Sequence, residues 1–191
     1  MKKLLLTLVL VTVTIILFAQ SDYDIIDRND YYIIKTGFST KSDTKTVSDI
    51  MNLNDVEQLL GKSSKTIREY RETQDDYQET IEYNDGIILR IPESKHGSIK
   101  FHITSSNYTL LLKSGEQIKV GMNSNELSMI FPNSFAKRQI IQNINGYNGK
   151  TGMLVYFSFK RENKVFIEDA WISFIIGEDG ILKEIKTVQP S

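Results

Sequence analysis

Apolar and polar residues alternate along much of the chain with the two-residue period of a β-strand. Ile99, Phe101 and Ile103 alternate with polar neighbours, which predicts a strand with one buried face. The pair Asp85-Gly86 lies between two apolar runs and is typical of a tight hairpin turn. The same criteria predict strands at residues 31–35, 79–83, 86–91, 99–104, 108–112, 153–160, 164–176 and 181–187.

Two short segments have the period of a helix instead, and they resemble each other. Residues 51–63 align without a gap with residues 122–134, which begin 71 positions later. In each segment an asparagine, Asn52 or Asn123, precedes an acid three positions on, as in a capping box. Apolar residues follow at helical spacing, and Gly61 or a proline ends the segment. The pattern predicts two short helices related as a repeat, with chance similarity between two amphipathic helices as the alternative.

The order of these elements predicts an α+β fold built from two degenerate units. Each unit has a short helix, then a linker, then an antiparallel meander, so short helices would pack on one face of an antiparallel sheet. We expect repeat unit 1 at residues 47–116 and repeat unit 2 at residues 117–191. A polar N-terminal segment, residues 21–46, precedes them, with residues 37–46 as a polar connector.

The second helical segment resembles the opening of a repeat found in two groups of proteins. One group is the outer-membrane assembly lipoproteins of the SmpA/BamE kind, and the other is the β-lactamase inhibitor proteins, which carry the unit in tandem. Within residues 118–134, the matching positions are Gly121, Met122, Glu126, Leu127 and Pro132. Ile50 replaces the expected glycine in the first copy, and the lipid-bearing cysteine of the lipoproteins is absent. The resemblance implies a fold and a tendency to bind proteins, but no particular partner.

The N-terminus has the three features of a secretory signal peptide. Lys2 and Lys3 precede an apolar and threonine-containing run at residues 4–18, and small and polar residues follow. We therefore expect residues 1–20 to be a signal peptide cleaved after Ala19 or Gln20, which places the rest of the chain in the periplasm or outside the cell. The alternative is an uncleaved anchor through residues 4–18, although that run is short for a membrane span. After cleavage no further membrane span is expected.

Composition narrows the possible functions. The formal net charge is -1, and no run of Lys or Arg exceeds two residues, which argues against nucleic-acid binding. The chain has no cysteine, which excludes disulfides, thiolate nucleophiles and zinc–thiolate sites. Neither histidine, His96 or His102, belongs to a catalytic or metal-binding motif. We expect no metal and no cofactor, and Glu168-Asp169 within an apolar strand predicts a bulge or an exposed strand face.

Aromatic residues crowd the last third of the chain, and most of them are expected in the core. Alternate side chains of a strand point to opposite faces, so Tyr156 cannot share a face with Phe157 and Phe159. An aromatic set left uncovered by helices would form a protein-binding patch, with Tyr156, Phe166 and Trp171 as candidates. The sequence therefore predicts a non-catalytic interaction module of the bacterial envelope that binds another envelope or secreted protein. An envelope hydrolase and a small-ligand carrier are the alternatives.

Overall fold

The structure is a computed structural model, and it describes residues 23–35, 53–72, 75–93, 99–142, 144, 146–161 and 164–189. β-Strands make up most of these residues, and a few short helices lie between them. No helix in this part of the chain is both long and apolar enough to cross a membrane. The expected signal peptide at residues 1–20 and the connector at residues 37–46 lie outside the described residues.

The elements follow one another as alternating groups of strands and short helices. In chain order they are β1 (Ile25–Asp27), β2 (Tyr31–Lys35), α2 (Leu53–Leu60), β3 (Lys65–Arg71), β4 (Asp76–Tyr83), β5 (Ile87–Pro92), β6 (Lys100–Ile103), β7 (Tyr108–Leu112), β8 (Gln117–Lys119), α3 (Ser124–Ile130), α4 (Pro132–Ala136), β9 (Gln139–Ile140), β10 (Thr151–Arg161), β11 (Lys164–Ile176) and β12 (Leu182–Val188).

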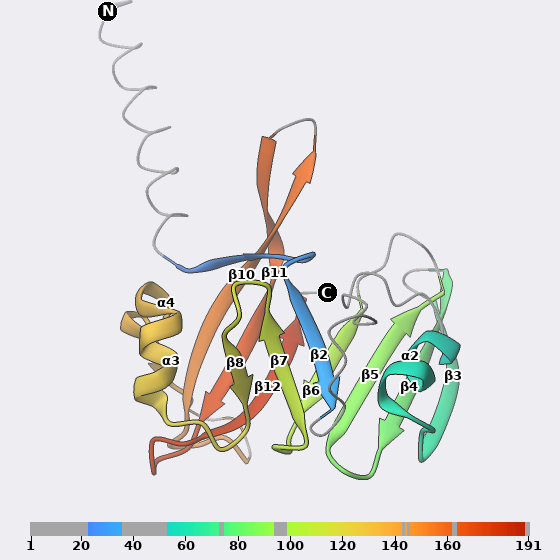
Figure 1. Ribbon diagram of the computed structural model, residues 1–191, viewed down its shortest axis with the longest axis horizontal. Coiled ribbons are helices and arrows are strands. Elements are labelled where there is room, and N and C mark those ends of the chain that lie inside the picture. The colour runs from blue at the N-terminus through green and yellow to red at the C-terminus, as the bar shows by residue number, and fades with distance from the viewer. Residues whose placement is uncertain are drawn as a thin grey trace, which may run out of the picture.

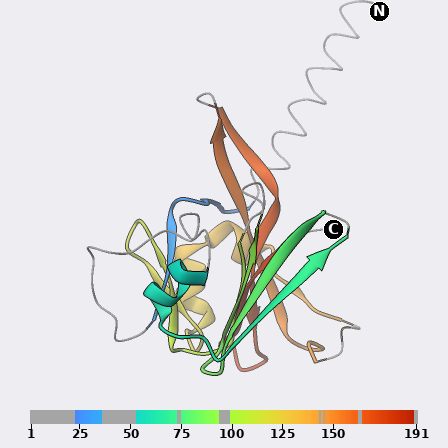
Figure 2. The same cartoon turned by 90° about the vertical axis from the view of Figure 1, so that its right-hand side faces the viewer.

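Most strands belong to one large sheet with the order β1-β10-β11-β12-β6-β5-β4-β3, and β9 pairs with β10 as well. The pairs are antiparallel except that β1 runs parallel to β10. A small sheet has the order β2-β7-β8. Figure 1 shows the small sheet and the helices in front of the large sheet. In Figure 2, turned by 90°, they lie together on one side of it.

The main hydrophobic core lies between the two sheets. Tyr31 of β2 stacks on Phe157 of β10, with ring centroids 5.7 Å apart, and its ring lies 6.1 Å from that of Phe101 on β6. Phe131, between α3 and α4, packs against Phe174 of β11, with ring centroids 5.6 Å apart. All five residues named here are buried. The two-residue period of the strands sends their other side chains to the opposite face of the large sheet.

The predicted strands are all present, with ends that differ by a few residues from those expected. The hairpin at Asp85-Gly86 is also confirmed, and Gly86 has a φ of 110°, a left-handed conformation that glycine adopts without strain. A side chain at this position would also collide with Ser105, because an added Cβ would lie 2.3 Å from the Ser105 Cβ.

Both predicted helices are confirmed as α2 and α3. Asn123 caps α3: its side chain accepts a hydrogen bond from the Asn125 N–H at 2.8 Å, and the Glu126 side chain accepts one from the Asn123 N–H at 3.2 Å. The corresponding Asn52 lies outside the described residues. Gly61, with a φ of 83°, follows α2 as expected. Pro132 ends α3 but also begins α4, because proline fits the first turn of a helix.

The predicted fold class needs correction in two respects. The molecule is mostly β, with a large mixed sheet rather than an antiparallel one, because β1 joins the edge of β10 in parallel. The predicted meander also does not continue through residues 108–112. β7 turns away from β6 and pairs with β2 and β8, since Tyr108, Leu110 and Leu112 are buried only when the small sheet packs over the core. The short helices do pack on one face of the large sheet. The two repeat units stay a prediction.

Candidate functional site

The face of the large sheet that points away from the small sheet is the main candidate for function, and we call it the open face. Its position follows from strand alternation. Ile185 pairs with Ile103 across β12 and β6, and both are fully buried in the core. The next pair, Lys186 and His102, therefore points to the opposite face, and both side chains are partly exposed. Figure 2 shows that the helices and the small sheet leave this side of the large sheet free.

A row of three aromatic rings lies on the open face at β10 and β11. Tyr156 and Trp171 are cross-strand partners with ring centroids 5.7 Å apart, and Tyr23 packs edge-on against Tyr156 at 5.1 Å. The rings are half-buried, so each keeps one part in contact with solvent. Burial, followed by the nearby Tyr23 and Asp169, raises the pKa of Tyr156, and its hydroxyl stays neutral at physiological pH. The row presents flat amphipathic groups of the kind that protein interfaces favour.

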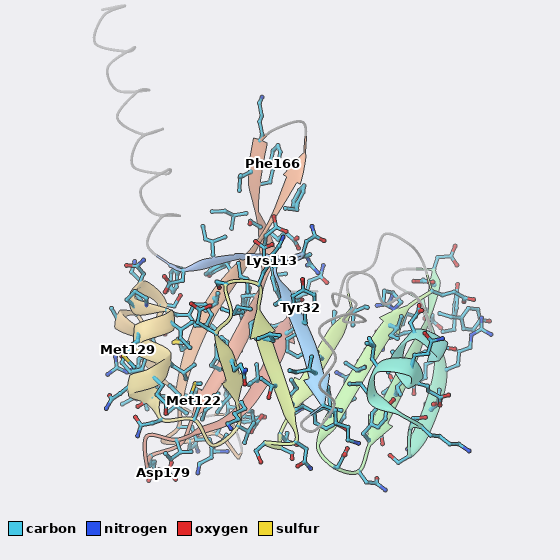
Figure 3. The ribbon with its side chains drawn as sticks, viewed as in Figure 1. Tyr32, Lys113, Met122, Met129, Phe166 and Asp179 are labelled. Carbon is cyan, nitrogen blue, oxygen red and sulfur yellow. The ribbon has the colours of Figure 1, made fainter. Side chains whose placement is uncertain are left out.

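The third candidate of the sequence analysis, Phe166, lies apart from this row. It stacks on its cross-strand partner Phe159 with ring centroids 5.3 Å apart, and both rings are exposed. Figure 3 shows Phe166 on the part of the β10–β11 hairpin that projects beyond the rest of the sheet. Alternation along β10 puts Phe159 on the face opposite to Tyr156. The structure thus brings Tyr156 and Trp171 together and separates Phe166 from them.

A pocket of about 310 Å³ opens beside the aromatic row. Its lining includes Leu154 and Ser173 of the sheet, Tyr23 of the aromatic row, and Ile140 and Ile144. The two isoleucines are among the most exposed large apolar residues, at 65% and 53%. The sequence analysis missed this pocket, because residues 139–144 have no strong periodicity and only the pairing of β9 with β10 brings them beside the sheet.

A carboxylate surrounded by polar groups lies on β12, on the same side of the row as the pocket. Glu184 accepts a hydrogen bond from the Tyr147 hydroxyl at 2.9 Å and lies 3.0 Å from the His102 Nε2. The amino groups of Lys150 and Lys186 lie 3.8 Å and 3.9 Å from its oxygens. The Glu184 side chain is only 14% exposed. The cluster fixes the segment that carries Tyr147 and Lys150 onto β12.

The alternation Glu184-Ile185-Lys186 could have located this cluster from the sequence, because it puts both charged residues on one face of a strand. His102 lies on the polar face of its strand, as predicted. His96 lies outside the described residues. His102 contacts the Glu184 carboxylate, and no serine in the described part of the chain is hydrogen-bonded to it.

Acidic residues also gather at a groove on the opposite side of the molecule, near the β7–β8 turn. This groove has a volume of about 520 Å³, and Asp24, Asp27, Asp30 and Glu116 line part of it. Asp24 accepts a hydrogen bond from the Ser134 N–H at 2.7 Å, and Asp30 pairs with Lys113 at 3.2 Å. A hydrogen bond from Ser114 holds the pKa of Glu116 below its usual value. A general acid needs a raised pKa, so Glu116 is not suited to that role.

Glu168 and Asp169, the two acids that the sequence analysis noted within an apolar strand, lie at an irregularity of the large sheet. The register of β10 and β11 shifts between the pairs Tyr156–Trp171 and Ser158–Ile167, which confirms a bulge at Glu168-Asp169. Glu168 forms an ion pair with Arg28. Among the described residues, no group of three or more His, Asp or Glu side chains could hold a metal ion.

Comparisons with protein-family models, with curated proteins and with solved structures find no match to this chain.

Proposed function

We propose that this chain is an exported, non-catalytic interaction module of the bacterial envelope, and that it binds another envelope or secreted protein through its open face. The observation that carries the proposal is the row of Tyr23, Tyr156 and Trp171 on the open face, which the described helices and the small sheet leave uncovered. Tyrosine and tryptophan contribute strongly to binding energy, because they bury a large area and lose little conformational freedom. The adjacent pocket suits an apolar side chain of the partner.

Export is part of the proposal and rests on the sequence of residues 1–20. The proposed fold relationship is the tandem helix-plus-meander repeat of the SmpA/BamE and β-lactamase-inhibitor kind. The order of elements supports it: α2 precedes the meander β3 to β6, α3 precedes the meander β10 to β12, and β12 pairs with β6 to join the two meanders. The extra helix α4 and strand β9 occur only in the second unit among the described residues.

A small-ligand carrier is the second candidate, and the pocket beside the aromatic row favours it. Its volume of about 310 Å³ and its largely apolar lining fall within the range of small-ligand sites. The two functions differ in whether they require Trp171, which does not line the pocket. A carrier needs only pocket residues such as Leu154 and Ile144, whereas a protein interface also needs the Trp171 ring.

Affinity capture tests the proposal. The tagged chain is exported, crosslinked in the envelope and recovered, and the proteins that accompany it are identified by mass spectrometry. We expect one reproducible partner that is lost with Trp171→Ala and with Tyr156→Ala. Tyr70→Ala is the matched control, because Tyr70 is 50% exposed and lies on the other face of the sheet. Thermal unfolding confirms that each variant is folded.

Two outcomes would contradict the proposal. One is that nothing is recovered beyond the untagged control. The other is that the same partner is recovered equally with Trp171→Ala and with the unchanged chain. If Leu154→Phe, which fills the pocket, blocks binding of small apolar molecules while partner capture persists, the carrier function holds independently.

A further inference from the structure

Strand β3 is the longest edge strand among the described residues. It forms one end of the large sheet, and all seven of its residues pair with β4 in an unbroken register. The opposite end is formed by β1 and β9, which have three and two residues. Figure 1 and Figure 2 show no described element beyond β3. A free edge presents unpaired backbone N–H and C=O groups that can pair with a further strand, unless short length, a bulge or proline prevents it. Since β3 has none of these three features, its edge is available for pairing.

The charged residues of β3 have a self-complementary order on the open face. Lys65, Ile67 and Glu69 alternate along the strand, so their side chains share one face. The strand registers place Lys65 in the same cross-strand row as Glu82 and His102, so this face is the open face. When a second copy of β3 runs antiparallel to the first about a two-fold axis at Ile67, each Lys65 lies opposite Glu69 of the other copy. Opposite charges at such cross-strand positions stabilise a sheet.

Neither of these two charges is matched by an ion pair within the described chain. Lys65 and Glu69 are exposed, and neither lies within ion-pair distance of an opposite charge on a described residue. In the β3–β4 register Lys65 lies opposite Glu82, and Glu69 lies opposite the uncharged Gln78. Pairing about Ile67 therefore places each Lys65 between two acids and gives each Glu69 a cationic neighbour.

The symmetric registers centred further along β3 fit less well. An axis at Arg68 would set this cation against itself, and an axis at Glu69 would do the same with the acid, which destabilises a sheet. An axis at Tyr70 would match Glu69 with Arg71, but Arg71 already pairs with Asp76 at 3.2 Å. The charge pattern therefore favours the first arrangement.

We propose that β3 is a self-association edge, through which two copies of this chain pair antiparallel about Ile67 and join their large sheets into one. The two-fold axis is then perpendicular to the sheet, so the open faces of both copies lie on the same side. Pairing holds whether or not the open face binds another protein, because the aromatic row lies at the other end of the sheet. Two seven-residue strands form a small interface, so the dimer is expected to be weak and dependent on concentration.

Cysteine crosslinking tests the pairing directly, because the chain has no cysteine of its own. Opposite residues of antiparallel strands have Cα atoms about 4.5–5.5 Å apart, a separation that a disulfide can span. Under mild oxidation, Ile67→Cys should form linked dimers at least about tenfold faster than Tyr70→Cys. Tyr70 is the more exposed of the two residues, but it lies opposite Ser64 of the second copy in the proposed register. Random collision would therefore favour the control variant.

Sedimentation equilibrium of charge-reversed variants tests the register independently. Glu69→Lys sets two cations opposite each other at two places in the dimer, so self-association should weaken by about tenfold or more, and Lys65→Glu should act similarly. An equimolar mixture of the two variants should associate again, because each lysine then lies opposite a glutamate. Thermal unfolding confirms that each variant is folded, which matters for Lys65→Glu because it also sets an acid opposite Glu82.

Three outcomes would overturn the proposal. The first is a chain that stays monomeric at all concentrations, which would leave the β3 edge to a strand of another protein. The second is crosslinking through Tyr70→Cys that equals or exceeds crosslinking through Ile67→Cys. The third is a mixture of the two charge-reversed variants that associates no better than either variant alone.

Discussion

The guanidinium group of Arg28 and the carboxylate of Glu168 form a bidentate ion pair between segments 140 residues apart. Arg28 lies between β1 and β2, and Glu168 lies in the bulge of β11. The side chains are 19% and 17% exposed. The Arg28 guanidinium also lies over the Phe157 ring, 4.7 Å from its centroid. The pair therefore fastens the N-terminal strands to the hairpin that carries the aromatic row.

Removing this ion pair is expected to destabilise the fold. Glu168→Gln leaves the partly buried Arg28 without a charged partner, so the free energy of unfolding should fall by about 1–3 kcal/mol. Urea denaturation, followed by the fluorescence of the single tryptophan, Trp171, measures the change. Asp169→Asn is the matched control at an exposed neighbour, with an expected change within about 0.5 kcal/mol. Equal effects of the two substitutions would contradict the structural role of the pair.

Helix α3 offers a comparison between a buried and an exposed residue two positions apart. Leu127 is fully buried, whereas Met129 is 76% exposed. Leu127→Ala should lower the free energy of unfolding by about 2–5 kcal/mol, because it removes buried methyl groups and leaves a cavity. Met129→Ala should change it by less than about 0.5 kcal/mol. Thermal and urea unfolding of both variants measure the difference. Similar losses would mean that α3 does not pack as described.

The cap of α3 also has a measurable contribution. Asn123→Ala removes the acceptor for the Asn125 N–H and should cost about 1 kcal/mol of stability, whereas Asn123→Ser should recover most of it. The predicted repeat adds a second expectation, that Asn52→Ala has a similar cost at the start of α2. Urea unfolding compares the variants. A loss at Asn123 without one at Asn52 would count against the equivalence of the two helices.

The buried tyrosines predict a loss of stability at alkaline pH. Burial, followed by the charges of Glu57 and Asp85, raises the pKa of Tyr83 to about 12, and burial also raises the pKa values of Tyr31 and Tyr108. These groups titrate near pH 10 in the unfolded chain, so the unfolded state loses their protons first. The stabilisation is fully present below about pH 10 and is lost as pH rises through the folded-state values.

Urea midpoints measured at intervals between about pH 8 and about pH 11 should therefore decrease above about pH 10. The Tyr83 hydroxyl donates a hydrogen bond to the Gly61 carbonyl at 2.8 Å. Tyr83→Phe loses this bond, so it should be less stable at neutral pH but show a shallower decline. A decline identical to that of the unchanged chain would assign the alkaline effect to the other two tyrosines.

Local sequence patterns were sufficient to predict several secondary-structure elements. The alternation at residues 99–104 and the Asp-Gly pair at 85–86 predicted a strand and a turn that the structure confirms, because both depend on neighbouring residues. β3 was missed, because its sequence has little apolar alternation and forms an edge strand through pairing with β4.

The sequence by itself determined the positions of most strands, the two amphipathic helices, the cap of α3 and the opposition of Tyr156 to Phe157 and Phe159. Each of these follows from side-chain period, capping or turn chemistry over a few neighbouring residues. Only the tertiary structure decided that β7 leaves the large sheet, that β1 joins it in parallel, and that Trp171 meets Tyr156 while Phe166 does not. These relationships depend on which distant strands pair and which face the second layer covers. Burial of the whole core selects such pairings, and no local segment carries that information.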